Sequence, residues 1–326
     1  MFEGLELLIN ALILLAGLLS LDKASDWTIT NSVKIAEITG FGKTTVGFIL
    51  VAFSTSLPEL SVSVFAALGQ GGVGVAIGNV LGSNIVNICL ILGACFLIMS
   101  LKMENGTFFA RITKEDLGSL YFGLFIASIV PLTLLYLGYA SRLVGVILLA
   151  IFFFNLYQLS KVKNVKEEGS LGDEKRKLRK YTSLTILGAF GTVASSYFIV
   201  DSATKIARSI GIDELVIGAT IVAFGTSIPE LATSVEAVRK GHLDLALGNI
   251  VGSAFINITC ILGITLVASP LPIQMTAFSD LAIFSLITNL ILWYFLSSEK
   301  LSWREGAVLL FMYFLFLAVS FGGLKT

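Results

Sequence analysis

The sequence predicts an all-α membrane protein of ten transmembrane helices, arranged as two five-helix repeats of inverted topology. Three observations lead to this expectation. Apolar residues make up 56% of the 326 residues and charged residues only 13%, whereas a soluble domain is about a quarter charged. Apolar runs long enough to cross a bilayer recur along the whole chain. Finally, the segments Val51–Leu60 and Val222–Leu231 are near copies of each other.

We expect ten membrane spans, each an apolar run bounded by polar or turn residues. The first run is interrupted by Asp22, Lys23 and Asp26, so we expect a long, tilted helix whose polar end reaches one membrane surface. Its counterpart in the second repeat carries Asp201 and Lys205. The ten runs cover residues 4–37, 43–68, 73–100, 117–138, 141–160, 181–207, 213–238, 243–268, 278–297 and 303–322.

One long polar connection divides the chain into a first repeat, residues 1–160, and a second repeat, residues 181–326. This connection, Lys161–Lys180, is expected to be a loop and holds eight of the 22 basic residues. Because cytoplasmic loops are rich in Lys and Arg, we place it in the cytoplasm of a cell-membrane protein, with both termini outside. The same side then receives Lys43, Lys102, Arg111, Lys114, Arg239, Lys240, Lys300 and Arg304.

The internal repeat is visible in two signatures. VAFSTSLPEL at Val51–Leu60 and VAFGTSIPEL at Val222–Leu231 are identical at eight of ten positions. GNVLGSNIVNI at Gly78–Ile88 and GNIVGSAFINI at Gly248–Ile258 are identical at six of eleven. Each repeat holds five predicted spans, and an odd number makes the second repeat enter the membrane from the opposite side. The repeat is therefore expected to be inverted, as in several secondary transporter folds.

Each copy of the first signature places a glutamate, Glu59 or Glu230, inside an apolar run. A charged side chain at membrane depth costs about 3 kcal/mol or more, so two related copies indicate a function. The preceding Pro58 has no backbone N–H and clashes with the carbonyl group four residues earlier, at Ser54. The resulting kink frees backbone carbonyl groups, which are tolerated in lipid only when something else satisfies them.

A bound cation is a natural partner for these groups. Hydroxyl groups stand beside each glutamate, from Thr55 and Ser56 in the first copy and from Thr226 and Ser227 in the second. Face to face, the two copies form an all-oxygen ligand set with two carboxylates, which suits Ca²⁺. The absence of His and Cys ligands argues against zinc, copper and iron.

The second signature adds neutral oxygen atoms. Ser83 and Asn87 lie four residues apart, as do Ser253 and Asn257, so each pair occupies one face of a helix. These side chains extend the predicted site for a smaller or monovalent ion. Packing alone is the alternative interpretation for each of the four.

Taken together, the paired signatures resemble the two alpha-repeats of the cation/calcium exchanger superfamily, over essentially the whole chain. The resemblance implies a calcium antiporter that works by alternating access, with Glu59 and Glu230 coordinating Ca²⁺ and the motif threonines assisting. It also implies that the first long span and its repeat mate form a sliding gate. Flanking monovalent sites are implied at Ser56, Ser83, Asn87, Ser227, Ser253 and Asn257. Two departures from the family pattern are Ser54, in place of Gly, and Asn257, where microbial sodium/calcium exchangers tend to carry Asp.

The counter-ion is expected to be H⁺, because two protons or one Ca²⁺ neutralise two carboxylates, whereas three Na⁺ leave an excess positive charge. Burial and a like-charged neighbour also favour the neutral carboxyl form. The alternative is Na⁺/Ca²⁺ exchange at the same site, to which the overall similarity points. A passive cation channel is a further alternative, and an intramembrane protease a weaker one. We expect no enzymatic activity, no organic cofactor and no nucleic-acid partner. The oligomeric state is left open.

Overall fold

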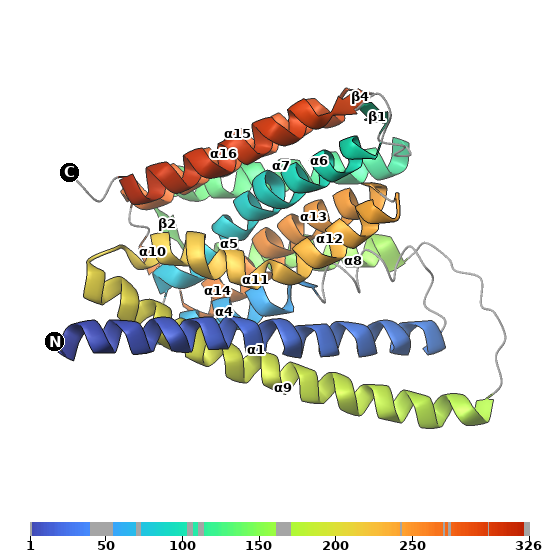
Figure 1. Cartoon of the computed structure of the whole chain (residues 1–326), viewed down its shortest axis with the longest axis horizontal. Helices are drawn as coiled ribbons and strands as arrows, with labels where there is room; N and C mark the ends of the chain where they lie inside the picture. The colour runs from blue at the N-terminus through green and yellow to red at the C-terminus, as the bar shows by residue number, and fades with distance from the viewer. Residues whose placement is uncertain are drawn as a thin grey trace.

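The computed structural model is almost entirely helical (Figure 1) and describes residues 2–39, 55–69, 73–102, 107–109, 114–160, 171–241, 243–269, 271–272, 275–298 and 300–322. The first half contains α1 (Phe2–Thr39), α4 (Leu57–Leu68), α5 (Val73–Ile85), the π-helix η2 (Val86–Leu92), α6 (Gly93–Leu101), β1 (Thr107–Phe109), α7 (Lys114–Leu137), β2 (Tyr139–Ala140) and α8 (Arg142–Ser160). The second half contains α9 (Leu171–Ile210), α10 (Glu214–Ile217), the π-helix η3 (Gly218–Val222), α11 (Ala223–Thr226), α12 (Ile228–Arg239), α13 (Leu243–Ile256), the π-helix η4 (Asn257–Ile261), α14 (Leu262–Ala268), β3 (Leu271–Pro272), α15 (Met275–Leu296), β4 (Lys300–Ser302) and α16 (Trp303–Gly322).

Membrane-spanning character is confirmed in the described part of the chain. Five helices there are long and apolar enough to cross a membrane, and a sixth span results when the bent pair Glu214–Thr226 and Ile228–Arg239 is counted as one. Three further apolar helices are shorter: Leu57–Leu68, Tyr121–Leu137 and Arg142–Tyr157. The chain is thus a multi-pass, nearly all-helical membrane protein, whereas the count of ten spans stays a prediction.

The predicted loop Lys161–Lys180 is corrected in its second half. Helix α9 begins at Leu171 and continues without interruption to Ile210, so the basic residues from Lys175 to Lys180 are helical. Leu, Glu, Lys and Arg, which dominate this stretch, are strong helix formers, so the charged segment extends the apolar helix that follows it. The rest of the predicted loop, residues 161–170, lies outside the described residues, as does His242, which was expected in a turn.

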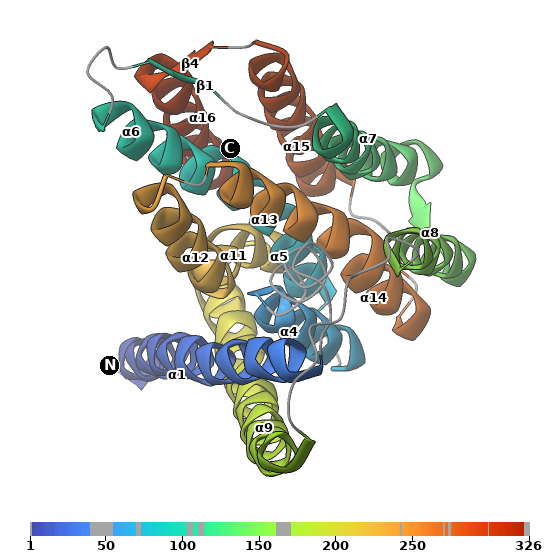
Figure 2. The same cartoon turned by 90° about the vertical axis from the view of Figure 1, so that its right-hand side faces the viewer.

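The two longest helices, α1 and α9, pack against each other along one side of the bundle (Figures 1 and 2). Lys34 of α1 lies 5.1 Å from the ring centroid of Tyr181 near the start of α9, while Gly17 faces Ile199 farther along α9. Higher residue numbers in one helix therefore meet lower numbers in the other, and the two helices run antiparallel.

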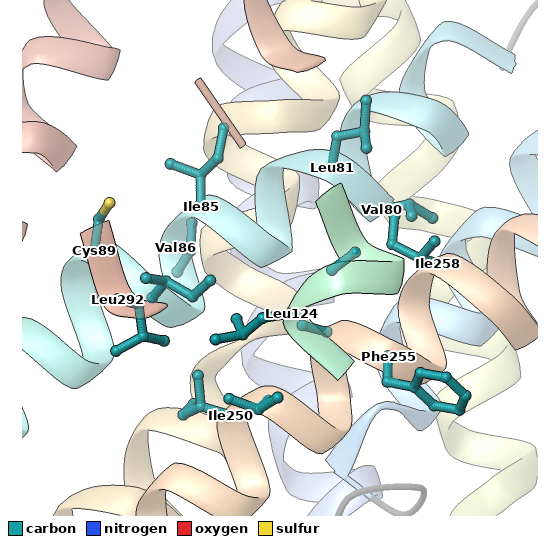
Figure 3. Packing of buried hydrophobic residues seen from close by; sticks show 14 of the residues in the cluster. Val80, Leu81, Ile85, Val86, Cys89, Leu124, Ile250, Phe255, Ile258 and Leu292 are labelled. Carbon is teal, nitrogen blue, oxygen red and sulfur yellow. The ribbon is translucent and has the colours of Figure 1, made fainter. Parts of the chain in front are cut away.

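The remaining helices enclose an apolar core between the two halves of the chain. Val80 and Ile85 of α5, Ile250 of α13 and Ile258 of η4 belong to one buried cluster, in which Figure 3 shows Val80 beside Ile258. All four side chains are fully buried. Leu124 of α7 joins the same cluster. The core is thus built from both repeats at once, so neither half buries its apolar surface alone.

Two short antiparallel ribbons also join the halves. At one end of the bundle β1 pairs with β4, with Phe109 opposite Lys300. Strand β2 pairs with β3, with Tyr139 opposite Pro272, and Figure 1 shows β2 toward the other end. Each ribbon takes one strand from each half. The β1–β4 ribbon therefore links α6 and α7 to α15 and α16, and the β2–β3 ribbon links α7 and α8 to α14 and α15.

Close approach of α5 and the α10–η3 segment depends on glycine. A Cβ atom on Gly82 would lie 2.6 Å from the carbonyl carbon of Ala219, and one on Gly78 would lie 2.8 Å from the Ala219 nitrogen while also meeting the carbonyl oxygen of Leu215. Small residues at this spacing let helix backbones approach closely in membranes. The repeat mate of Gly78 behaves differently, because a Cβ atom on Gly248 would meet nothing within 4 Å.

We therefore expect Gly78→Ala and Gly82→Ala to destabilise the protein, because the added methyl group overlaps backbone atoms that have no rotamer to change. Overpacking of this kind costs about 1–3 kcal/mol. Gly248→Ala is the matched control and is expected to be neutral or slightly stabilising. Thermal unfolding in detergent measures the difference, and equal midpoints for Gly78→Ala and Gly248→Ala would contradict the packing argument.

Candidate functional site

Glu59 and Glu230 occupy equivalent places in the two halves. Each follows a proline in the first turn of a helix, α4 or α12, and each is fully buried. The prolines therefore start new helices, where a missing N–H group is tolerated, instead of kinking continuous ones. In the second half, the axes of the helices before and after the break differ by 47°. A carboxylate at a helix N-terminus is stabilised by the helix dipole.

Non-helical serines mark the two breaks. Ser227 separates α11 from α12 and has φ −85° and ψ 8°. Ser56 precedes α4 with nearly the same backbone, φ −83° and ψ 6°. Ser54, whose carbonyl was expected to be freed by Pro58, lies outside the described residues.

The two serine hydroxyl groups cross between the halves. Ser227 donates a hydrogen bond to Oε1 of Glu59 at 3.0 Å. Ser56 donates to Oε1 of Glu230 at 3.4 Å. Each carboxylate is thus bound by the break of the other half, which brings the two glutamates into one site.

The second signature reaches the same oxygen atoms from within each half. Ser83 of α5 donates to Oε1 of Glu59 at 3.5 Å, and Ser253 of α13 donates to Oε1 of Glu230 at 3.3 Å. The other oxygen, Oε2, of each carboxylate is buried and has no hydrogen-bond partner among the described residues. Each glutamate therefore keeps one carboxylate oxygen available to a ligand.

Thr55 and Thr226 are held by asparagines of the opposite half. Thr226 donates to Oδ1 of Asn79 at 3.0 Å, and Thr55 donates to Oδ1 of Asn249 at 3.4 Å. The hydroxyl of Thr226 also lies 3.2 Å from the carbonyl oxygen of Ala223. The threonines that the sequence assigned to the site are therefore fixed from across the repeat boundary.

Asn79 and Asn249 were missed by the sequence analysis. The Nδ2 atom of Asn79 donates to the Ser63 hydroxyl at 3.0 Å and to the backbone carbonyl of Glu59 at 3.3 Å. Asn249 donates to the Ser234 hydroxyl at 3.1 Å. These amides connect the opposite threonine to the helix that carries their own glutamate.

A signal for these two residues is present in the sequence. Asn79 and Asn249 are identical in both copies of the second signature and stand four residues before Ser83 and Ser253. This spacing places each asparagine on the same helix face as the serine. A polar residue that recurs in both repeats of an apolar helix therefore indicates a residue of the site.

The remaining predicted residues, Asn87 and Asn257, are fully buried and lie in the π-helical segments η2 and η4. Asn257 donates to Oδ1 of Asn84 at 3.4 Å. Asn87 has no hydrogen-bond partner for either amide atom among the described residues. The other eight predicted residues thus form the hydrogen bonds around the two glutamates and the two threonines, and Asn87 and Asn257 lie one helical turn beyond Ser83 and Ser253.

The chemistry of the site is that of hard oxygen donors. It offers two carboxylates and neutral hydroxyl and amide groups. Within the described ranges, no group of three or more His, Cys, Asp and Glu side chains gathers. Oxygen ligands of this kind suit Ca²⁺, Na⁺ or a proton better than the softer transition metals.

Comparisons with known proteins give a consistent result. The family described as sodium/calcium exchanger protein matches residues 9–161 and 180–322. The sodium/calcium exchanger MaX1 of Methanosarcina acetivorans is 30% identical, with 96% of this chain and 99% of the relative covered. The solved sodium-calcium exchanger NCX_Mj superposes with a TM-score of 0.66 at 28% identity, covering 96% of this chain and 99% of the other. An H⁺/Ca²⁺ exchanger, CAX, shares the fold with a TM-score of 0.76 at 20% identity, covering 97% and 88%.

We expect Asn79→Ala to destabilise the protein, because it removes the acceptor of Thr226 and the donor to Ser63 and to the Glu59 carbonyl. Each buried polar group left without a partner costs about 1–3 kcal/mol. The control is Thr133→Ala, since Thr133 is exposed and, within the described chain, its hydroxyl bonds inside its own helix, to the Ile129 carbonyl. Thermal unfolding midpoints in detergent test this expectation. A midpoint for Asn79→Ala as high as that of the control would show that Asn79 does not stabilise the contact between the two halves.

Proposed function

The chain belongs to the sodium/calcium exchanger protein family, which confirms the resemblance to the cation/calcium exchanger superfamily, and we propose that it is a secondary-active calcium/cation antiporter. The family is one of membrane transporters rather than catalytic enzymes. One observation carries the proposal: Glu59 and Glu230 are fully buried, and each accepts a hydroxyl hydrogen bond from the other half of the chain.

The proposed architecture is two inverted five-helix repeats. Three correspondences support it: the serine breaks before α4 and α12, the π-helical segments that begin within the last residues of each second signature, and the two ribbons that each pair one strand from each half. An inverted repeat places broken helices face to face near the membrane midplane, which is where substrate sites of such transporters lie.

Calcium is the proposed divalent substrate. Its charge balances the two carboxylates, and Ca²⁺ takes six to eight oxygen ligands in flexible geometry. The free Oε2 atoms of Glu59 and Glu230 supply two of these ligands, and Thr55 and Thr226, which precede the glutamates in the same segments, are proposed as further ligands. The flanking donors proposed for a monovalent ion are Ser56, Ser83, Asn87, Ser227, Ser253 and Asn257.

For the counter-ion, the structure and the relatives support Na⁺ as the first candidate. The amide oxygens of Asn87 and Asn257 are buried without a hydrogen-bond partner among the described residues. Neutral oxygens can bind Na⁺, whereas protons that neutralise the two carboxylates need no neutral ligands. The relatives MaX1 and NCX_Mj are both named as sodium/calcium exchangers. Protons remain the second candidate on the charge-balance argument, so the sequence-based preference for H⁺ stays a prediction.

The proposed mechanism is competition for one site. Ca²⁺ binds the two carboxylates from one side of the membrane, and counter-ions that load from the other side displace it. The protein changes conformation only when the carboxylates are neutralised, because uncompensated charge is costly in the membrane interior. Helices α1 and α9 are the proposed gate, and Leu18 of α1 packs directly against Gly225 at the second break.

The membrane orientation proposed from the basic residues has support at one end of the bundle. Lys102, after α6, donates from Nζ to the backbone carbonyl oxygen of Arg239 at the end of α12. Lys240, which follows directly, pairs with Glu236 at 3.1 Å. Lys102, Arg239 and Lys240, which were assigned to the cytoplasm from different spans, therefore lie at the same end of the bundle, as the proposed orientation requires.

We expect Glu59→Gln and Glu230→Gln to abolish calcium transport, because either change removes one of the two charges that balance Ca²⁺ while preserving side-chain shape. Glu236→Gln is the control, since Glu236 is exposed and pairs only with Lys240 among the ion pairs of the described chain. Calcium flux into proteoliposomes, together with monodispersity in detergent, gives the readout. Normal transport by either buried variant would overturn the site assignment.

The counter-ion is decided by gradient-driven calcium uptake into proteoliposomes. We expect an imposed Na⁺ gradient at clamped pH to drive uptake, because neutral oxygens flank the carboxylates. Uptake driven only by a pH gradient would instead establish H⁺/Ca²⁺ exchange. Calcium flux driven by voltage alone, without any counter-ion gradient, would indicate a passive channel and refute antiport.

A further inference from the structure

The hydrogen bonds of the site come in pairs that the internal repeat relates. Ser227 to Glu59 corresponds to Ser56 to Glu230, and Thr226 to Asn79 corresponds to Thr55 to Asn249. The bonds from Ser83 and Ser253 form a further pair. A divalent ion between the glutamates is therefore offered nearly the same ligands by both halves.

One contact breaks this pairing. Asn257 of the second half donates from Nδ2 to Oδ1 of Asn84 in the first half, at 3.4 Å. The residue equivalent to Asn84 is Ala254, at the offset of 170 that also relates Asn87 to Asn257 (254 − 84 and 257 − 87). Alanine offers no side-chain acceptor, and Asn87 accordingly has no partner for either amide atom within the described chain.

The contact has a geometric consequence. The amide group of asparagine is planar, with its nitrogen and oxygen on opposite sides of Cγ. When Nδ2 of Asn257 is bound to Asn84, its Oδ1 atom is directed away from Asn84. This oxygen is buried and has no hydrogen-bond partner among the described residues. Asn257 is therefore restrained with a free carbonyl oxygen, whereas no such bond restrains Asn87.

We propose that Asn84 is a positioning residue for the Na⁺ counter-ion. By accepting the amide hydrogen of Asn257, it presents the Asn257 carbonyl oxygen to a monovalent cation and makes the two halves of the site unequal. The inference rests on the proposed function, in which Asn257 is one of the flanking donors. Calcium, which is balanced by the two carboxylates, depends on Asn84 far less.

The test is Asn84→Ala, which gives the first half the residue that the second half carries at the equivalent position. Calcium efflux from proteoliposomes is measured against external Na⁺ at saturating Ca²⁺, and against Ca²⁺ at saturating Na⁺. We expect the Na⁺ concentration for half-maximal exchange to rise about three- to tenfold, the effect of losing one neutral hydrogen bond. The half-saturating Ca²⁺ concentration should change less than about twofold on the same argument.

Asn155→Ala on α8, a helix that carries none of the site residues, is the matched control and should leave both values unchanged. Should Asn84→Ala not fold, Asn84→Ser retains a polar side chain but is too short to hold the Asn257 amide, and the same rise is expected. The converse variant, Ala254→Asn, supplies Asn87 with an amide and should also shift the half-saturating Na⁺ concentration while sparing that for Ca²⁺.

Equal weakening of Na⁺ and Ca²⁺ by Asn84→Ala would indicate a purely structural role and overturn the inference, as would an unchanged response to Na⁺. These results leave the proposed antiport intact, because they are judged against a wild-type protein that exchanges the two ions. If the wild-type protein responds only to a pH gradient, both the Na⁺ assignment and the inference fall. If it shows no gradient-driven calcium flux, the proposed function itself fails.

Discussion

The burial of two carboxylates, those of Glu59 and Glu230, is the constraint on which the surrounding helix breaks and hydrogen bonds depend. Buried charges are stable only when neighbouring groups compensate them, and here the compensation comes from helix N-termini and hydroxyl groups. Glu59 and Glu230 each sit in the first turn of a helix and accept bonds from serines of both halves. The proline that starts each helix and the serine that precedes it supply part of this compensation.

The tight packing and the polar network depend on each other. Asn79 and Ser83 project from α5, the helix that Gly78 and Gly82 allow to approach the α10–η3 backbone. Without that approach the bond from Thr226 to Asn79 would not span the boundary between the halves. An apolar core shared by both repeats surrounds these contacts (Figure 3), and it excludes competing hydrogen-bond partners.

The sequence was informative wherever chemistry and repetition coincide. Two copies of a Pro-Glu signature predicted the buried glutamates and their hydroxyl neighbours, and composition predicted the membrane fold. The partners across the repeat, such as Ser227 with Glu59, could not be read from the chain, because spacing within one helix does not say which residue of another helix it meets. Polarity likewise misled the prediction for Lys175–Lys180, since a charged run can belong to a solvated helix as well as to a loop. The inequality of Gly78 and Gly248 depends on what lies opposite each, which identical residue types do not reveal.

The crossing of hydroxyl groups between the halves has a consequence for how such a chain can be divided. Neither half contains all the hydroxyl donors to its own glutamate, because Glu59 accepts a hydrogen bond from Ser227 and Glu230 accepts one from Ser56. Two copies of one half would offer similar signatures, yet they would lack the unlike surfaces at Gly78 and Gly248. A chain that joins two copies of one repeat can therefore hold two parts that are no longer interchangeable. Once the copies have diverged at such positions, each is an obligate complement of the other, and the single chain guarantees one of each.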